Sequence, residues 1–199
     1  MKIITTAEGG AAVTNNYKLA KMMYQFRTHG ITKDKIDFTE KNDSPWYYEQ
    51  NLVGYNYRLT DIHAALGISQ IKRIDDFVKK RHLLAERYNK KLNKKFIITP
   101  YQSSRCYSAY HLYVIRVKVS KNINHRNGLF NLLRSNNIGV NVHYIPIHLQ
   151  PIYQKMGFSK GDFPCAEQYY EEAISIPLYP DLKVSEQNKV IDLINNYFK

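Results

Sequence analysis

The sequence predicts an α/β fold in which helices pack on a small sheet. In the second half of the chain, β-branched and apolar runs alternate with segments whose apolar residues recur at three- and four-residue steps. A length of 199 residues suggests one domain or at most two small ones. Hydrophobic residues form 44% and charged residues 23% of the chain, a globular composition that excludes a disordered chain.

The first residues predict two short strands. Apolar and polar residues alternate in Ile3–Thr6 and again in Ala11–Thr14, with Gly9-Gly10 between them. Alternation with a period of two is typical of a half-buried strand, and paired glycines are typical of a tight turn. We therefore expect a hairpin at the start of the chain.

A helix and a long loop are expected next. Asn15 or Asn16 can cap a helix that carries Leu19, Met22, Met23 and Phe26 on one side and ends at Gly30. Residues 31–57 show no periodicity and predict a loop, which at this length is usually functional or disordered. Its aromatic residues favour an ordered, functional loop: Phe38, Trp46, Tyr47, Tyr48, Tyr55 and Tyr57.

A long helical pattern runs from Thr60 to about Asn93. Its apolar stripe includes Ile71, Ile74, Val78, Ala85, Tyr88 and Leu92. Arg81 fills the one polar slot in this stripe, and Gly67 can mark a bend.

The next segments predict a strand, a helix and a second strand. A turn around Thr99-Pro100 precedes a β-branched run from Tyr113 to Val119. Leu129, Leu132 and Leu133 share one side of a helix expected over 125–136, and Gly139–His143 follows as a strand.

The last part of the chain predicts two helices around an extended segment. After a loop with Pro146 and Pro151, a short helix is expected near 165–173, and Ile174–Leu178 is expected to be extended. Ser185 can cap a final helix that turns Val190, Ile191, Ile194 and Phe198 inward.

Composition narrows the classes of protein. No apolar run approaches the ~20 residues of a membrane span, and the first residues lack the features of a secretory signal. Cys106 and Cys165 have no metal-type spacing, so neither a zinc site nor a disulfide framework is indicated, and we expect both to be small hydrophobic residues. We expect a soluble, cytoplasmic protein.

The chain is basic, with a net charge of +12. This charge suits nucleic acid, an anionic membrane surface or phosphorylated small molecules. Many basic residues lie between Lys72 and Lys95, where the expected helix would place them on its solvent side. A solvated helix face is the favoured interpretation.

Several motifs then identify a family. Lys2-Ile3-Ile4-Thr5-Thr6-Ala7-Glu8-Gly9-Gly10-Ala11 resembles the segment around the cofactor lysine of the DegT/DnrJ/EryC1/StrS sugar aminotransferases. Other matching motifs follow in the family's order: Arg27-Thr28-His29-Gly30, Gly54–Ile62, Ala64–Gly67 and Val142–Pro151. With Pro45–Glu49 and Gly161–Pro164, the chain is most similar to the branch that makes 4-amino-4,6-dideoxy UDP-sugars. The resemblance covers nearly the whole chain but only the C-terminal half of the family's chain.

The resemblance implies a fold and a domain order. It implies the C-terminal part of a type I aminotransferase that binds pyridoxal 5'-phosphate. Residues 1–58 would be a remnant of the large cofactor-binding domain with an active-site loop, 59–95 a long connecting helix, and 96–199 the small α/β domain.

The resemblance also assigns site residues. Lys2 would bind the cofactor and move a proton, whereas residue type alone favours a solvated terminal lysine. Asn56 would reach the cofactor phosphate of the neighbouring subunit, and Arg58 would lie by the same site and contact substrate. Without the motif, Asn56-Tyr57-Arg58 would simply be loop and helix cap.

A second group of candidates lies beside two prolines. The resemblance favours His148 as a substrate contact, and Tyr144 in the same loop is expected to bind substrate as well. His143 could bind a sugar diphosphate or relay protons, or could equally be a partly buried histidine bonded to the backbone. The aromatic residues of the 46–57 loop suit either stacking on uracil or sugar, or a dimer interface.

Three functions stay open. The first is transfer of an amino group, with glutamate as donor, to a UDP-4-keto-6-deoxy amino sugar for cell-surface or flagellar sugars. The resemblance implies a homodimer with shared active sites for the intact enzyme, and this chain is then expected to be a fragment that is inactive alone. The second is a non-catalytic small domain that pairs with another subunit. The third is a basic nucleic-acid-binding domain, which no motif supports.

Overall fold

A computed structural model describes residues 2–118 and 125–199. The chain divides into two compact units, Ile3–Lys72 and Arg73–Lys199, with Lys2 grouped with the second. Among the described residues, no helix combines the length and the apolar character needed to cross a bilayer.

The first unit contains two helices and a small hairpin. Helix α1 spans Tyr17–Arg27, and its N-cap Asn16 accepts a hydrogen bond from the Leu19 amide at 3.1 Å, as the sequence predicts. Helix α2 spans Asp61–Ile71 and is capped by Thr60. The expected 31–57 loop contains a hairpin in which β1 (Ile31–Thr32) pairs antiparallel with β2 (Glu49–Gln50), and a 3-10 turn η1 (Lys35–Asp37).

The hairpin connection is ordered by one carboxylate. Glu49 accepts hydrogen bonds from the Thr39 amide at 2.7 Å, the Glu40 amide at 3.1 Å and the Tyr47 hydroxyl at 3.1 Å. The bonds from the Thr39 and Glu40 amides lower the pKa of Glu49, because they stabilise its charged form. The prediction of an ordered segment is therefore confirmed, and the prediction of a loop throughout is wrong.

The expected N-terminal strands are not formed. Ile3–Thr6 and Ala11–Thr14 lie outside every helix and strand. Ala7 has a φ of 67° and Gly9 a φ of 143°, so the chain between them turns. A strand needs a partner for its backbone groups, and no described strand lies beside either segment.

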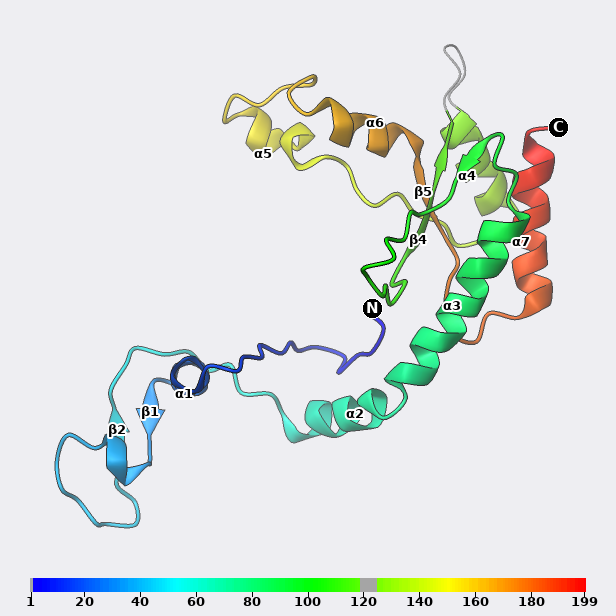
Figure 1. Cartoon of the computed structure of the whole chain (residues 1–199). Helices are drawn as coiled ribbons and strands as arrows, with labels where there is room; N and C mark the ends of the chain where they lie inside the picture. The colour runs from blue at the N-terminus through cyan, green and yellow to red at the C-terminus, as the bar shows by residue number, and fades with distance from the viewer. Residues whose placement is uncertain (1, 119–124) are drawn as a thin grey trace. The chain divides into compact units, whose positions relative to one another are not determined.

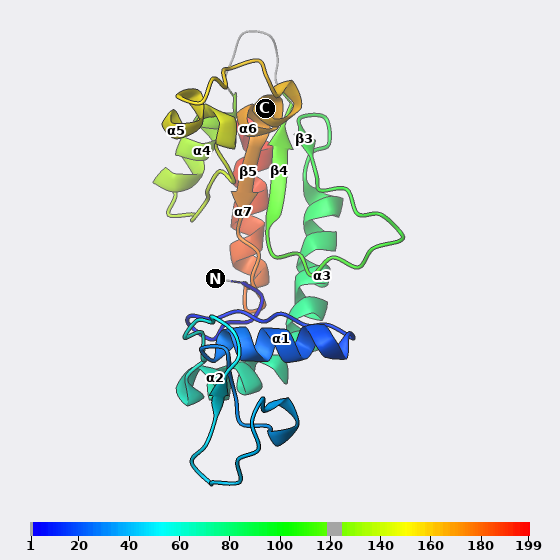
Figure 2. The ribbon, with the colours of Figure 1, turned by 90° about the vertical axis from the view of Figure 1, so that its left-hand side faces the viewer.

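The second unit packs helices on a three-stranded antiparallel sheet. The strand order is β3 (Ile97–Ile98), β4 (Tyr113–Val117) and β5 (Ala173–Ile176), with Tyr113 opposite Ile176. Helices α3 (Ile74–Lys91) and α7 (Val184–Tyr197) lie on the same side of this sheet (Figures 1 and 2). The remaining elements are α4 (His125–Ser135), the 3-10 turn η2 (Ile147–Leu149), α5 (Pro151–Gln154) and α6 (Pro164–Glu172).

The apolar core belongs to the second unit. Leu129 and Leu133 of α4 are fully buried, as their shared helix face predicts, and so is Ile194 of α7. The alternate residues of β4, namely Tyr113, Ile115 and Val117, point into the same core. The predicted α/β fold, with helices packed on a small sheet, is confirmed.

Several element boundaries differ from the sequence predictions. The expected 60–93 helix is two helices separated at Lys72–Arg73, and α2 continues through Gly67. Gly139–His143 forms only one bridge, between Asn141 and Ser175, instead of a strand. Lys183, not Ser185, is the N-cap of α7, and its backbone N–H donates to Glu186 at 3.0 Å. The end of the Tyr113–Val119 strand prediction lies outside the described residues.

Candidate active site

Lys2, the candidate cofactor lysine, has an uncommitted amine. Its side chain is exposed, and it makes no hydrogen bond or ion pair with any residue that the structure describes. A primary amine in this state can reach an aldehyde or a phosphate. Lys2 groups with the second unit, whereas Asn56 and Arg58 lie in the first.

Asn56 is held in place by its backbone. The Tyr55 amide donates to Phe26 O at 2.7 Å, the Tyr57 amide donates to Arg27 O at 2.9 Å, and Asn56 forms a bridge with Thr28. These bonds also satisfy carbonyls at the end of α1, which have no partner inside the helix. The Asn56 side chain is exposed, and its amide makes no hydrogen bond within the described residues.

Two glycines allow this close approach of the loop to the helix end. Gly30 has a φ of 74°, and a Cβ there would lie 1.8 Å from the Leu52 carbonyl oxygen. A Cβ on Gly54 would lie 2.3 Å from the Gly30 nitrogen. Only glycine fits both positions, so the family-like motifs Arg27–Gly30 and Gly54–Ile62 meet here because of their glycines.

Arg58 lies just before α2 and is exposed. Its guanidinium has no hydrogen-bond partner or ion pair among the described residues, so its donors remain available to an anion. Tyr55 and Tyr57 flank Asn56 and stack on each other with ring centroids 5.0 Å apart. The first unit therefore presents an amide and a guanidinium beside an aromatic pair.

His148 is buried in the second unit, paired with Glu167. The His148 Nε2 and Glu167 Oε1 atoms are 2.8 Å apart, and Glu167 also accepts the Gly161 amide at 2.7 Å. The Gly161 N–H and the His148 ring lower the pKa of Glu167, because both stabilise the carboxylate. Only 7% of His148 is exposed, so this imidazole cannot present an open ring to a large ligand.

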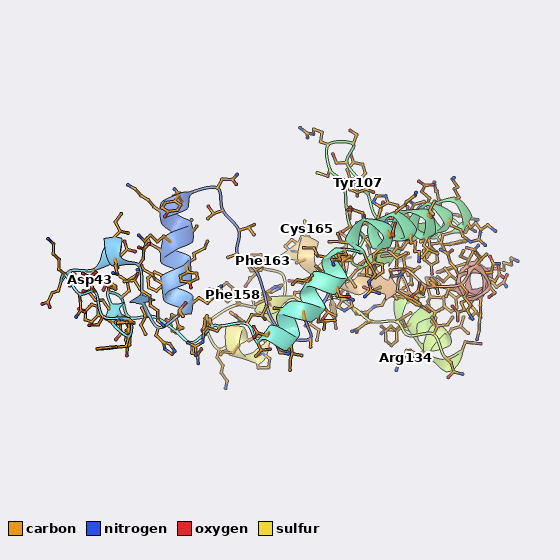
Figure 3. The ribbon with its side chains drawn as sticks, turned by 90° about the horizontal axis from the view of Figure 1, so that it is seen from below. Asp43, Tyr107, Arg134, Phe158, Phe163 and Cys165 are labelled. Carbon is orange, nitrogen blue, oxygen red and sulfur yellow. The ribbon has the colours of Figure 1, made fainter. Side chains whose placement is uncertain are left out.

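His148 also lines an apolar cavity of about 540 Å³. Phe158 and Phe163 lie close together on its wall, near Cys165 (Figure 3), with ring centroids 6.1 Å apart. Tyr144 stands at the cavity with 71% of its surface exposed. Tyr144 and His148, both expected from the sequence to contact substrate, therefore line the same cavity.

His143 is not among the residues that line this cavity, although its ring centroid lies 4.5 Å from that of Tyr144. Its Nδ1 lies 2.7 Å from the hydroxyl of Ser175 on β5, and Nε2 lies 3.4 Å from the Asn141 amide nitrogen. Side chains rather than backbone therefore bind this histidine.

Sequence reasoning missed Glu167 and misjudged the cysteines. The sequence predicts the short helix near 165–173 that carries Glu167. However, no spacing rule links Glu167 to His148, which lies 19 residues earlier. A carboxylate in the helix that follows Gly161–Pro164 was the available signal. Cys106 and Cys165 are both exposed, so their interpretation as small hydrophobic residues is wrong.

The residues match a known family. Residues 1–195 match the DegT/DnrJ/EryC1/StrS aminotransferase family. The UDP-4-amino-4,6-dideoxy-N-acetyl-beta-L-altrosamine transaminase of Campylobacter jejuni is 32% identical over 98% of this chain and 49% of its own length. The chain spans about half the length of the curated relatives it matches.

Solved structures agree. Helicobacter pylori PseC, an aminotransferase of pseudaminic acid biosynthesis, superposes with a TM-score of 0.84 at 28% identity, over all of this chain and 51% of its own. The PMP-form of the putative sugar aminotransferase Spr1654 from Streptococcus pneumoniae has a TM-score of 0.84 at 27% identity, over 98% of this chain and 50% of its own.

Proposed function

The chain belongs to the DegT/DnrJ/EryC1/StrS aminotransferase family, and we propose that it provides one half of a sugar-nucleotide aminotransferase. The reaction is amino transfer from glutamate to C4 of a UDP-4-keto-6-deoxy amino sugar, for cell-surface or flagellar sugars. The observation that carries this proposal is Lys2: it opens the family-like motif, and its amine is exposed and uncommitted.

The cofactor of this family is pyridoxal phosphate, which one similar solved structure holds in its amino form. The residues present fit this group by their chemistry. A primary amine (Lys2) suits an aldehyde, and an uncommitted amide (Asn56) suits a phosphate. When bound, the cofactor supplies an electron sink that makes removal of a proton from the adjacent carbon feasible.

Each site residue then has a role. The Nζ of Lys2 holds the cofactor and moves a proton to or from the reacting carbon. Asn56 donates its amide to the cofactor phosphate of a neighbouring subunit in a homodimer, and Arg58 binds an oxygen of the substrate's diphosphate. The rigid backbone bonds around Asn56 support this role, because a fixed donor loses little entropy on binding.

Tyr144 and His148 contribute to the substrate side differently. Tyr144 is exposed and can contact a sugar or a base directly. His148 is buried and bonded to Glu167, so it acts by holding the wall that carries Phe163, whose ring centroid lies 4.8 Å from that of the imidazole.

Amino transfer by a reconstituted enzyme tests the proposal. The complementing half is the part of the Campylobacter jejuni relative that this chain does not span, produced separately or fused ahead of Lys2. We expect glutamate-dependent formation of the UDP-4-amino sugar by the pair and none by the chain alone. Lys2→Arg should abolish turnover, whereas Lys33→Arg, at another exposed lysine, should retain it. Turnover that survives Lys2→Arg would contradict the proposal.

A second candidate has one observation in its favour. The core lies entirely in Arg73–Lys199, so this part can be a non-catalytic module that pairs with another subunit. Pairing with a partner that carries its own complete site, without any effect of Lys2→Arg, would favour this alternative.

A further inference from the structure

One histidine of the second unit has a ring without hydrogen-bond partners. His111 is partly buried, and its Nδ1 atom is shut off from solvent without a partner. Within residues 2–118 and 125–199, its Nε2 atom makes no hydrogen bond either. A buried polar atom without a partner destabilises a fold. A functional role is therefore a better explanation of this histidine than a contribution to stability.

The backbone of His111 is held in place on both sides. Arg81 donates to the carbonyl oxygens of Tyr110 at 3.0 Å and of His111 itself at 3.4 Å. Tyr110 has a φ of 44°, a left-handed conformation that a bulky residue rarely adopts, and β4 begins at Tyr113. A residue fixed in this way presents its ring in one place, which is what a residue that orients another group needs.

Several positive charges act on this imidazole. Burial lowers the pKa of His111, and the charges of Lys2, Arg81 and His143 lower it further. The imidazole is therefore neutral at neutral pH, and one of its nitrogens is a free acceptor. Interactions between charges weaken with distance, so Lys2, which groups with the second unit, lies near this ring.

Of the described residues whose charges act on His111, Lys2 alone has an uncommitted donor group. Arg81 donates to backbone carbonyls, and the Nδ1 of His143 lies 2.7 Å from the Ser175 hydroxyl. The Lys2 amine makes no hydrogen bond or ion pair within the described part of the chain. An acceptor without a donor and a donor without an acceptor therefore lie in the same part of the second unit.

We propose that His111 is a positioning residue for Lys2: in the complete site, its imidazole accepts a hydrogen bond from the Lys2 Nζ and holds the amine in one orientation. This inference rests on the proposed function, in which Lys2 holds the cofactor. A lysine amine sits on a flexible four-carbon stem, and fixing that stem costs conformational entropy. A neutral acceptor orients the amine without placing a second positive charge beside it.

The stability of the chain alone gives the first test. His111→Phe removes both ring nitrogens and keeps an aromatic ring, so the midpoint of urea unfolding should stay the same or rise. His82 is the matched control, because its Nε2 lies 2.7 Å from the Ser108 carbonyl oxygen. His82→Phe should lower the midpoint. An equal fall in both variants would give His111 a structural role and overturn the inference.

The rate at which pyridoxal phosphate labels Lys2 gives the second test. The 199-residue chain is mixed with its complementing half and the cofactor, reduced with borohydride at successive times, and analysed by mass spectrometry. His111→Phe should slow the labelling of Lys2 about tenfold, the effect of one lost hydrogen bond, and His82→Phe less than about twofold. His111→Asn returns an acceptor near Nδ1, and His111→Gln returns one near Nε2. One of these two amides should restore the rate to within about threefold of wild type.

Unchanged labelling in His111→Phe, or slow labelling that neither amide restores, would overturn the role of His111 and leave the proposed function standing. A wild-type chain without any label on Lys2 would contradict both. Labelling that depends on His111, but without amino transfer by the pair, would contradict the proposed function and support the hydrogen bond between His111 and Lys2.

Discussion

The sequence identifies Arg81 as an unusual polar residue in an apolar stripe, but it does not reveal which groups Arg81 binds. It interrupts the apolar stripe of α3 and is only 7% exposed. One guanidinium nitrogen donates to the carbonyl oxygens of Tyr110 at 3.0 Å and Leu178 at 2.7 Å. Burial lowers the pKa of this guanidinium, which still stays charged at neutral pH. The acceptors lie 29 and 97 residues away, so no local pattern could reveal them.

Removing this side chain should destabilise the second unit. Arg81→Ala leaves buried carbonyls without a donor, and each unsatisfied group costs about 1–3 kcal/mol. We expect the free energy of unfolding, from urea denaturation followed by circular dichroism, to fall by about 3 kcal/mol. Arg134→Ala, at an exposed arginine of α4, should change it by less than about 0.5 kcal/mol. Equal losses in the two variants would show that the carbonyl contacts do not matter.

Glu167 gives a prediction with a definite pH dependence. Its pKa is lower in the folded chain than the ordinary value of 4.5. The charged carboxylate therefore stabilises the fold above that value, and this contribution is lost as the pH falls through the lower, folded pKa. The stability difference between wild type and Glu167→Gln should stay constant above about pH 5 and shrink below it. Glu171→Gln, on the exposed side of α6, serves as the control, and a difference that grows on acidification would refute the assignment.

Among the secondary-structure elements, apolar periodicity predicted the positions of the helices more accurately than the residues at which they begin and end. The stripes of α1, α4 and α7 predicted helices that the structure confirms. The break at Lys72–Arg73 was missed, because apolar residues continue through it and only the backbone there departs from the helix. The N-terminal strands were wrong because alternation reports a propensity, whereas a strand also needs a partner.

The loop that carries Asn56 depends on Gly30. Gly30→Ala places a Cβ against the Leu52 carbonyl at a positive φ, which should cost about 2 kcal/mol locally. We expect the amides of Tyr55 and Tyr57 to exchange about 30-fold faster in hydrogen-exchange measurements. Gly10→Ala, where a Cβ meets no atom within 4 Å, should leave this exchange unchanged. Unaltered protection in Gly30→Ala would show that the loop does not need this contact.

In the molecule as a whole, each of the two units is stabilised by different interactions. The second unit has a continuous core from α3, α4, α7 and the sheet, whereas the first has hydrogen bonds and glycine contacts without a core. The sequence predicted the layers of the second unit, because the helices and the sheet that bury its apolar residues all belong to this chain. It could not predict the Ile3–Thr14 segment, because a strand needs a neighbouring strand and no described strand pairs with this segment.

Limited proteolysis should expose this difference. We expect a protease to cut first within Ile3–Lys72 and to leave a resistant product that begins near Arg73, because local opening is easiest where few apolar contacts form. Mass spectrometry of the products identifies the boundary. Early cleavage inside β4, β5 or α7 would contradict a core confined to the second unit.

Covalent trapping of the cofactor tests the proposed role of Lys2. The chain and its complementing half are mixed with pyridoxal phosphate, reduced with borohydride and digested, and the modified lysine is located by mass spectrometry. We expect a single phosphopyridoxyl group on Lys2, and we expect it to be absent from the Lys2→Arg variant. A label on another lysine, or one spread over the exposed lysines while Lys2 is unmodified, would contradict it.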